Sequence, residues 1–77
     1  MFITLYGKYG PQAPKNHVIN TNLIEKIQPY EPLFSSKEKY YDIWVHDDGY
    51  GPKYVYRVSR TEAKKLCDAI GIDIQDL

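Results

Sequence analysis

Apolar and polar residues alternate along several short stretches of this chain, and a period of two predicts β-strands. The clearest stretch is 40–46. One face of that strand carries Tyr41, Ile43 and Val45, and the other carries Asp42, Trp44 and His46. The apolar face is expected to point to the core. Trp44 is therefore expected on the face nearer to water.

The same alternation predicts four more strands, near 2–7, 17–20, 23–30 and 53–58. The turn residues Gly49–Pro52 join 40–46 to 53–58 as a β-hairpin. Segments 8–16 and 31–39 contain glycine or proline and are expected to be loops. Segment 23–30 fits a helix as well as a strand, but its isoleucines and Pro29 favour a strand, with a helical turn at 22–25 left open.

A helix is predicted at 60–70. Ser59 and Glu62 have the spacing of a capping box, in which each side chain bonds the backbone N–H of the other residue. Gly71 is placed to end the helix. Its apolar stripe consists of Ala63, Leu66, Cys67 and Ile70.

These elements predict one α+β domain over residues 1–77. It would be a small antiparallel sheet, or a partly rolled barrel, of four to five strands with one C-terminal α-helix covering an open end. A core of this size is expected to provide modest stability, at or below about 5 kcal/mol.

Composition narrows the class of function. Ten basic and ten acidic residues cancel, so the whole molecule has no long-range field for nucleic acid or anionic lipid. No run reaches the roughly 18 apolar residues that a membrane helix needs. Cys67 is the one cysteine, and the N-terminus lacks the pattern of a secretion signal. We therefore expect a cytoplasmic protein without membrane contact.

No motif for catalysis is present, so we expect a noncatalytic protein without a cofactor. Cys67 lies on the apolar stripe of the predicted helix, where a small buried thiol is the expected role. Gly7 and Gly10 run into Pro11 with no helix after them, unlike a phosphate-binding loop.

Four potential metal ligands lie close together in the sequence, namely Asp42, His46, Asp47 and Asp48. Carboxylates and imidazole suit divalent cations. However, their spacing matches no metal-binding loop, and a pair of aspartates before a glycine is ordinary turn chemistry. We therefore expect no metal site.

The tyrosine-rich hairpin is the main candidate for binding. The chain has eight tyrosines, and tyrosine, tryptophan and arginine are the residue types that dominate protein interfaces. The predicted partner-binding residues are Trp44, Tyr50, Tyr54, Tyr56 and Arg57, with Trp44 as the anchor. The partner is expected to be another protein or, through a self-complementary strand edge, a second copy in a homodimer.

An alternative is nucleic-acid binding through segment 53–65. This segment contains one acidic residue, Glu62, and five basic residues, namely Lys53, Arg57, Arg60, Lys64 and Lys65. Beside the aromatic residues they could hold phosphates and stack bases. A solvated helix face would give the same sequence pattern, and the neutral net charge favours a protein partner.

In layout the chain resembles the FlbD-like small flagellar proteins. The resemblance rests on the segments 2–7 and 18–27 and on the strand 54–59, which leads into a helix. A looser similarity is to the β-rich LytTR domain. The chain departs from the FlbD-like pattern in segments 8–16 and 31–39 and in its hairpin, so no functional residue is carried over. The resemblance implies a small β-rich fold that works by binding. Separately, the small size of the chain leads us to expect a bacterial or phage accessory protein.

Overall fold

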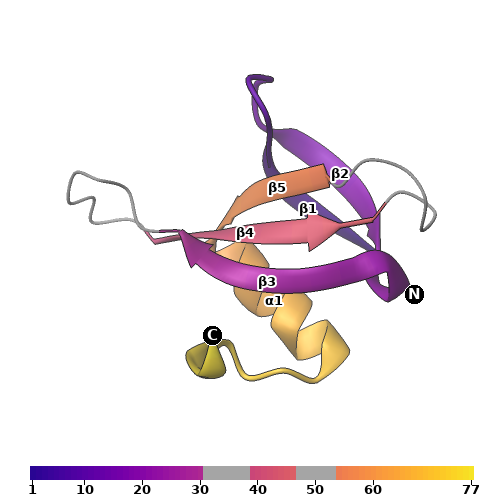
Figure 1. Ribbon diagram of the computed structural model, residues 1–77, viewed down its shortest axis with the longest axis vertical. Helices are drawn as coiled ribbons and strands as arrows, with labels where there is room; N and C mark the ends of the chain where they lie inside the picture. The colour runs from indigo at the N-terminus through magenta and orange to yellow at the C-terminus, as the bar shows by residue number, and fades with distance from the viewer. Residues whose placement is uncertain (31–38, 47–53) are drawn as a thin grey trace.

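The computed structural model describes residues 1–30, 39–46 and 54–77, which form one five-stranded antiparallel sheet and one α-helix (Figure 1). The strands are β1 (Phe2–Tyr9), β2 (Lys15–Asn20), β3 (Ile24–Tyr30), β4 (Tyr40–Val45) and β5 (Tyr54–Ser59), and the helix is α1 (Arg60–Ile70). Two short 3-10 turns are η1 (Thr21–Leu23) and η2 (Ile74–Asp76). The predicted α+β class is confirmed. Of the two predicted forms, a small antiparallel sheet or a partly rolled barrel, the structure has the open antiparallel sheet.

The order of strands across the sheet is β2-β1-β5-β4-β3. The first strand therefore pairs with the last one, with Gly7 opposite Val58 and Tyr9 opposite Tyr56. Strands β2 and β3 form the two edges. This order brings β1, β5 and β4 side by side at the centre, although β1 is far from the other two in sequence.

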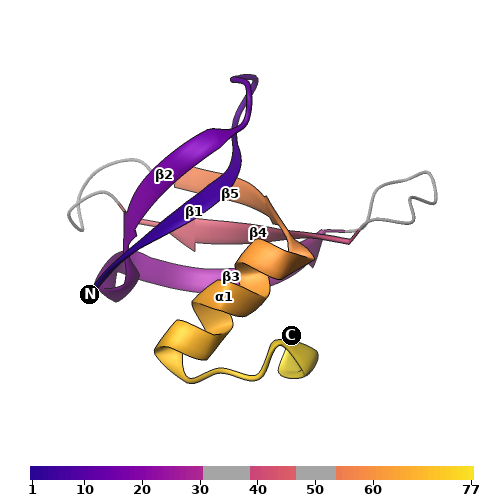
Figure 2. The same ribbon diagram turned by 180° about the vertical axis from the view of Figure 1, so that it is seen from behind.

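The helix covers one face of the sheet, which we call the inner face. It lies behind the sheet in Figure 1 and in front of it in Figure 2. Three helix residues, Ala63, Leu66 and Cys67, are fully buried. They pack against buried strand residues from the inner face: Leu5, Ile19, Tyr41, Ile43, Val45 and Val58. The predicted core face of β4 is therefore confirmed.

Local sequence fixes both ends of α1. The hydroxyl oxygen of Ser59 accepts a hydrogen bond from the backbone N–H of Glu62 at 3.3 Å, which is one half of the predicted capping box. Gly71 ends the helix with φ of 80°, a left-handed conformation that glycine adopts without strain. The helix therefore has the bounds that the sequence predicted.

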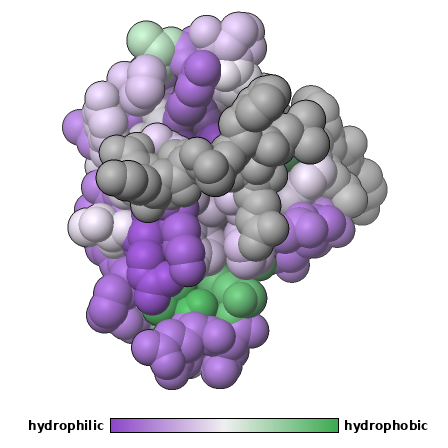
Figure 3. All heavy atoms as spheres, turned by 90° about the vertical axis from the view of Figure 1, so that its left-hand side faces the viewer, coloured by the Kyte–Doolittle hydropathy of each residue, from purple (hydrophilic) through white to green (hydrophobic). Residues whose placement is uncertain are grey.

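The C-terminal segment closes the core on the side of β3. Ile70, Ile72 and Leu77 line a hollow together with Ile24 and Ile27 of β3. Figure 3 shows a group of hydrophobic residues in the lower part of the molecule, above the hydrophilic residues at its lowest point. Ile74 of η2 is buried in the core. The chain after Gly71 thus completes the packing that α1 begins.

Several predicted boundaries are wrong by a few residues. Strand β1 continues to Tyr9 and β2 begins at Lys15, so the predicted loop 8–16 shrinks to the turn at Gly10–Pro14. Pairing with β5 extends β1, because Lys8 and Tyr9 gain partners there that local sequence does not reveal. The helical turn predicted at 22–25 is the 3-10 turn Thr21–Leu23, and β5 extends to Ser59. The predicted start of β5 at Lys53 lies outside the described residues.

Gly7 allows β1 and β5 to approach closely. A Cβ atom at this position would lie 2.6 Å from Cγ1 of Val58 and 2.7 Å from the backbone oxygen of Arg57. The second of these atoms belongs to the backbone, which cannot turn aside as a side chain can. Glycine at position 7 is therefore a requirement of the central strand pair.

We predict that Gly7→Ala lowers the free energy of unfolding by about 1–3 kcal/mol, because the methyl group overpacks the contact between β1 and β5. Urea denaturation of the variant and the wild type measures the change. Thr4→Ala is the control: Thr4 is an exposed residue of the same strand, and its replacement should change stability by less than about 0.5 kcal/mol. Equal effects of the two substitutions would contradict the role given to Gly7.

Candidate functional site

The face of the sheet opposite α1, which we call the outer face, has no element packed on it among the described residues. Strand alternation and register arrange its side chains in rows that run across the strands. The outer face carries Tyr6 and Lys8 from β1, Val55, Arg57 and Ser59 from β5, Tyr40, Asp42 and Trp44 from β4, and Lys26, Gln28 and Tyr30 from β3. Four of these side chains are aromatic and three are basic.

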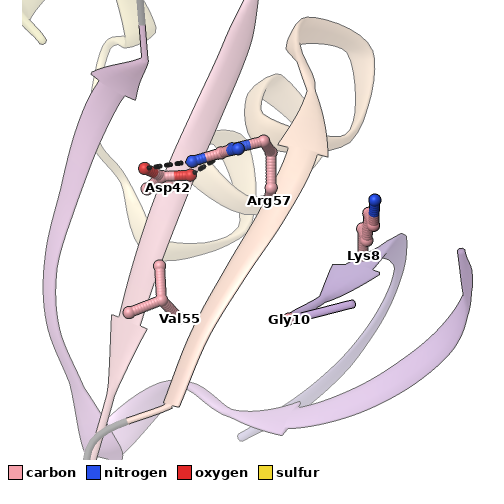
Figure 4. A pocket seen from close by; sticks show the side chains of 5 residues that line it. All are labelled: Lys8, Gly10, Asp42, Val55 and Arg57. Atoms are coloured by element: carbon pink, nitrogen blue, oxygen red, sulfur yellow. Dashed lines mark hydrogen bonds and ion pairs between the residues drawn. The ribbon is translucent and has the colours of Figure 1, made fainter. Parts of the chain in front are cut away.

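The central row runs through Gln28, Asp42, Arg57 and Lys8, one residue from each of β3, β4, β5 and β1. The guanidinium of Arg57 donates to both carboxylate oxygens of Asp42, from Nε to Oδ1 at 2.9 Å and from Nη2 to Oδ2 at 3.3 Å. Figure 4 shows these two side chains facing each other, with Lys8 on the other side of β5. The row therefore contains one anion and two cations, and the anion Asp42 is paired with Arg57.

Arg57 is held in place from a second direction. Its guanidinium carbon lies 3.5 Å from the ring centroid of Tyr30, a cation–π contact. The hydrogen bond with Asp42 is the main cause that raises the pKa of Arg57 above its ordinary value. The guanidinium is thus a fixed, permanently charged group on the outer face.

Two shallow hollows lie on either side of this row. The larger, about 440 Å³, is bounded by the aromatic side chains Tyr6, Tyr30 and Tyr40 together with Lys8 and Arg57. The smaller, about 210 Å³, is lined by Lys8, Gly10, Asp42, Val55 and Arg57 (Figure 4). Lys8 and Arg57 belong to both hollows. A ligand could therefore lie in either hollow and contact the same two cations.

Trp44 lies on the outer face, as the alternation predicted, but it is half-buried. The ammonium group of Lys26 sits 4.5 Å from the centroid of its ring. The indole N–H is buried and has no acceptor among the described residues. By contrast Tyr6 is 51% exposed, so it presents more of its side chain to a partner than Trp44 does.

The predicted partner-binding residues do not share one surface. Trp44 and Arg57 are on the outer face, whereas Tyr54 and Tyr56 point to the inner face. There Tyr56 packs against Tyr9 and His17, with ring centroids at 5.5 and 4.8 Å. Alternation separates positions 54 and 56 from position 57, because side chains at even and odd positions leave a strand on opposite faces. Tyr50 lies outside the described residues.

The basic residues of segment 53–65 do not converge either. Arg60 donates to the hydroxyl of Tyr41 at 3.2 Å on the side of the helix. On α1, Lys64 pairs with Asp68 at 3.0 Å and Lys65 pairs with Glu62 at 3.5 Å. Arg57 alone reaches the outer face, and Lys53 lies outside the described residues. The helix lysines are neutralised by neighbours one turn away, so segment 53–65 does not present a single basic surface within the described residues.

The four residues weighed as metal ligands are divided in the same way. Asp42 bonds Arg57, and Nε2 of His46 lies 3.5 Å from a carboxylate oxygen of Glu25. Asp47 and Asp48 fall outside the described residues. Elsewhere in the described chain, no three His, Cys, Asp or Glu side chains gather closely enough to hold a metal ion.

Sequence reasoning missed Tyr6, Lys8, Tyr30 and Tyr40 as members of one surface. The first two come from β1 and the others from β3 and β4. The alternation along β1 is a signal in the sequence that places Tyr6 and Lys8 on one face of that strand. That this face continues onto β5, β4 and β3 depends on strand order, which no local pattern reveals.

Comparison of the chain with protein-family models, with curated proteins and with solved structures finds no match. The resemblance to FlbD-like proteins therefore stays a prediction. Within residues 1–30, 39–46 and 54–77, no helix combines the length and the apolar character needed to cross a membrane.

We predict that Arg57→Ala lowers the free energy of unfolding by about 1 kcal/mol, because it removes two hydrogen bonds and the contact with Tyr30. Lys64→Ala is the control. It removes an exposed ion pair within one helix and should cost less than about 0.5 kcal/mol. Urea denaturation measures both values. Equal losses in the free energy of unfolding would contradict the role given to the contacts of Arg57.

We also predict that the thiol of Cys67 makes stability fall at alkaline pH. Burial, aided by Asp68 and Asp73, raises the pKa of Cys67 above its ordinary value. The unfolded chain then loses its thiol proton first, so the free energy of unfolding falls as pH rises above about 8.5. The test compares the free energies of unfolding of the wild type and of Cys67→Ala at pH 7 and at higher pH. The stability of the wild type relative to the variant should fall at the higher pH. A constant difference would contradict the raised pKa.

Proposed function

We propose that this domain is a noncatalytic binding module that recognises another protein through the outer face of its sheet. The observation that carries the proposal is the larger hollow of about 440 Å³, which we call the groove. In the groove, three tyrosines surround the fixed cation Arg57 and the exposed cation Lys8. Tyrosine and arginine contribute much of the binding energy at protein interfaces. This surface replaces the hairpin as the proposed binding site.

The fixed position of Arg57 in the groove supports the proposal. The residues of the groove come from four neighbouring strands and, with Pro14, from the turn between β1 and β2, and Arg57 is held by both Asp42 and Tyr30. Binding to Arg57 would therefore cost little side-chain entropy, and the loss of such entropy is one of the main terms that oppose binding. Preorganised groups on strands also hold their geometry better than groups on loops.

The charges indicate what the partner presents. Asp42 already compensates Arg57, whereas Lys8 makes no ion pair among the described residues. An acidic side chain next to an apolar or aromatic one would meet Lys8 and the tyrosine rings together. We therefore propose a partner segment that combines a carboxylate with an apolar side chain.

A second candidate is binding of single-stranded nucleic acid by the same face. Among the described residues, the outer face carries the basic residues Lys8, Lys26 and Arg57, and its acidic residue Asp42 is already paired with Arg57. An open sheet with aromatic and basic side chains is a surface on which bases stack and phosphates are held. The strongly exposed apolar residues Phe2 and Val18, at 71% and 69%, favour a protein partner instead.

The buried free thiol of Cys67 fits a reducing compartment, so we include a cytoplasmic location in the proposal. The predicted bacterial or phage origin is also part of the proposal. Identifying the partner tests both statements, because the partner has to occur in the same compartment and the same organism.

We predict that Tyr6→Ala and Lys8→Glu each weaken partner binding about tenfold or more, because they remove an exposed ring and an exposed cation from the groove. The measurement is capture of proteins from cell extract on the immobilised domain, followed by titration with the captured protein. Lys64→Glu, the same charge change on α1, is the matched control and should leave binding unchanged. Binding that ignores the two groove variants would overturn the proposal.

Titration with mixed-sequence single-stranded DNA and RNA at low and physiological salt separates the second candidate. Trp44 fluorescence and an independent measurement of size report the complex. Saturable binding that weakens steeply with salt, and is lost with Lys8→Glu, would assign the groove to nucleic acid. Absence of binding in both salts would leave protein recognition as the function to pursue.

A further inference from the structure

A second interaction surface lies at the edge of the sheet. We propose that β2 pairs antiparallel with β2 of a second copy of this chain, so that two domains form one continuous ten-stranded sheet. This inference goes beyond the proposed function, because it uses the edge of β2 and not the groove around Arg57. It rests on the register of β2 and on the contrast between the two edges of the sheet.

The unpaired backbone groups of β2 can be identified from the register. The backbone N–H of Thr21 donates to the carbonyl oxygen of Met1 at 2.8 Å, and the pairing continues with Ile19 opposite Ile3 and His17 opposite Leu5. In an antiparallel pair, every second residue directs its N–H and C=O toward the neighbouring strand. The odd residues of β2 therefore bond β1, and Asn16, Val18 and Asn20 direct their backbone groups to the open edge.

These three residues allow a symmetric pairing. With a two-fold axis at Val18, this residue lies opposite its own copy, and Asn16 lies opposite Asn20 of the second copy. Each of the three has a backbone N–H for the new ladder. Ile19 then lies opposite His17, so inner-face residues meet inner-face residues and outer-face residues meet outer-face residues.

Charge favours this register over its neighbour. Lys15 is the one charged residue of β2, and in the proposed register it faces the uncharged Thr21 at the end of the ladder. An axis at His17 would place Lys15 opposite Ile19, which is buried in the core. The two copies of Lys15 lie at opposite ends of the proposed interface, so they do not repel each other closely.

The other edge of the sheet is protected against such pairing. Strand β3 contains Pro29, which has no N–H to donate, and its register with β4 shifts between Ile24 and Lys26. A proline and an irregular register are both devices that keep an edge strand from pairing. Strand β2 has neither device, and no described residue pairs with its open side.

Burial supplies the driving force. Val18 is 69% exposed and would be covered at the centre of the interface. On the outer face of β1, Thr4 lies directly opposite Val18, and Phe2 and Tyr6 lie diagonal to it. A small domain with a limited core gains from extending its sheet in this way.

The first experiment is sedimentation equilibrium of the whole chain from about 1 µM to about 1 mM, the range in which weak self-association is detected. We expect a monomer–dimer equilibrium. Val18→Lys places two lysines opposite each other at the axis and should raise the dimer dissociation constant about tenfold or more. Thr4→Lys is the matched control: it adds the same charge on the same face, one strand away from the edge, and should leave the dimer intact.

A second experiment tests the register directly. Val18→Cys should form a covalent dimer under mild oxidation, because paired residues at the axis have Cα atoms about 5.5 Å apart, within the reach of a disulfide. Thr4→Cys should not, and the buried Cys67 takes no part. A monomer throughout the concentration range would overturn the proposal. So would a dimer that persists in Val18→Lys, or one that Thr4→Lys disrupts equally.

Discussion

The packing of α1 against the inner face of the sheet is the interaction on which the rest of the structure depends. An eleven-residue helix is about 16 Å long and about 10 Å wide, and neighbouring strands lie about 4.8 Å apart. One such helix covers about three strands, and α1 contacts β1, β5 and β4. Ala63, Leu66 and Cys67 lose all exposure in this contact. The inner faces of the edge strands β2 and β3 therefore have to be covered by other residues.

The inner face shows how the rest is covered. On the side of β3, Ile70 and Ile74 continue the packing beyond the centre of α1. Toward β2, the ring of Tyr56 packs against the rings of Tyr9 and His17. Tyr56 therefore extends the core and Tyr54 packs against Tyr9, which is why these two tyrosines do not share a surface with Trp44 and Arg57.

The outer face has no such cover among the described residues, and its order comes from pairing across the strands. Arg57 is the central group, because it contacts Asp42 on one side and the ring of Tyr30 on the other. The same contacts that stabilise the sheet thus hold a cation in a groove lined by tyrosines. The edge of β2 and this groove are adjacent parts of one surface, so a dimer of the proposed kind would carry two grooves on a single face.

The sequence by itself determined the local elements of this protein. Ser59 and Glu62 begin the helix and Gly71 ends it, and alternation assigned Ile43 to the core and Trp44 to the opposite face. These features depend on residues a few positions apart, where periodicity and capping act. Only the tertiary structure decided that β1 lies beside β5, and with it the end of β1 at Tyr9 and the meeting of Tyr6, Tyr30 and Tyr40. The physical reason is that strand pairing joins residues about fifty positions apart through backbone hydrogen bonds that are alike for all side chains, so the local pattern carries no record of the partner.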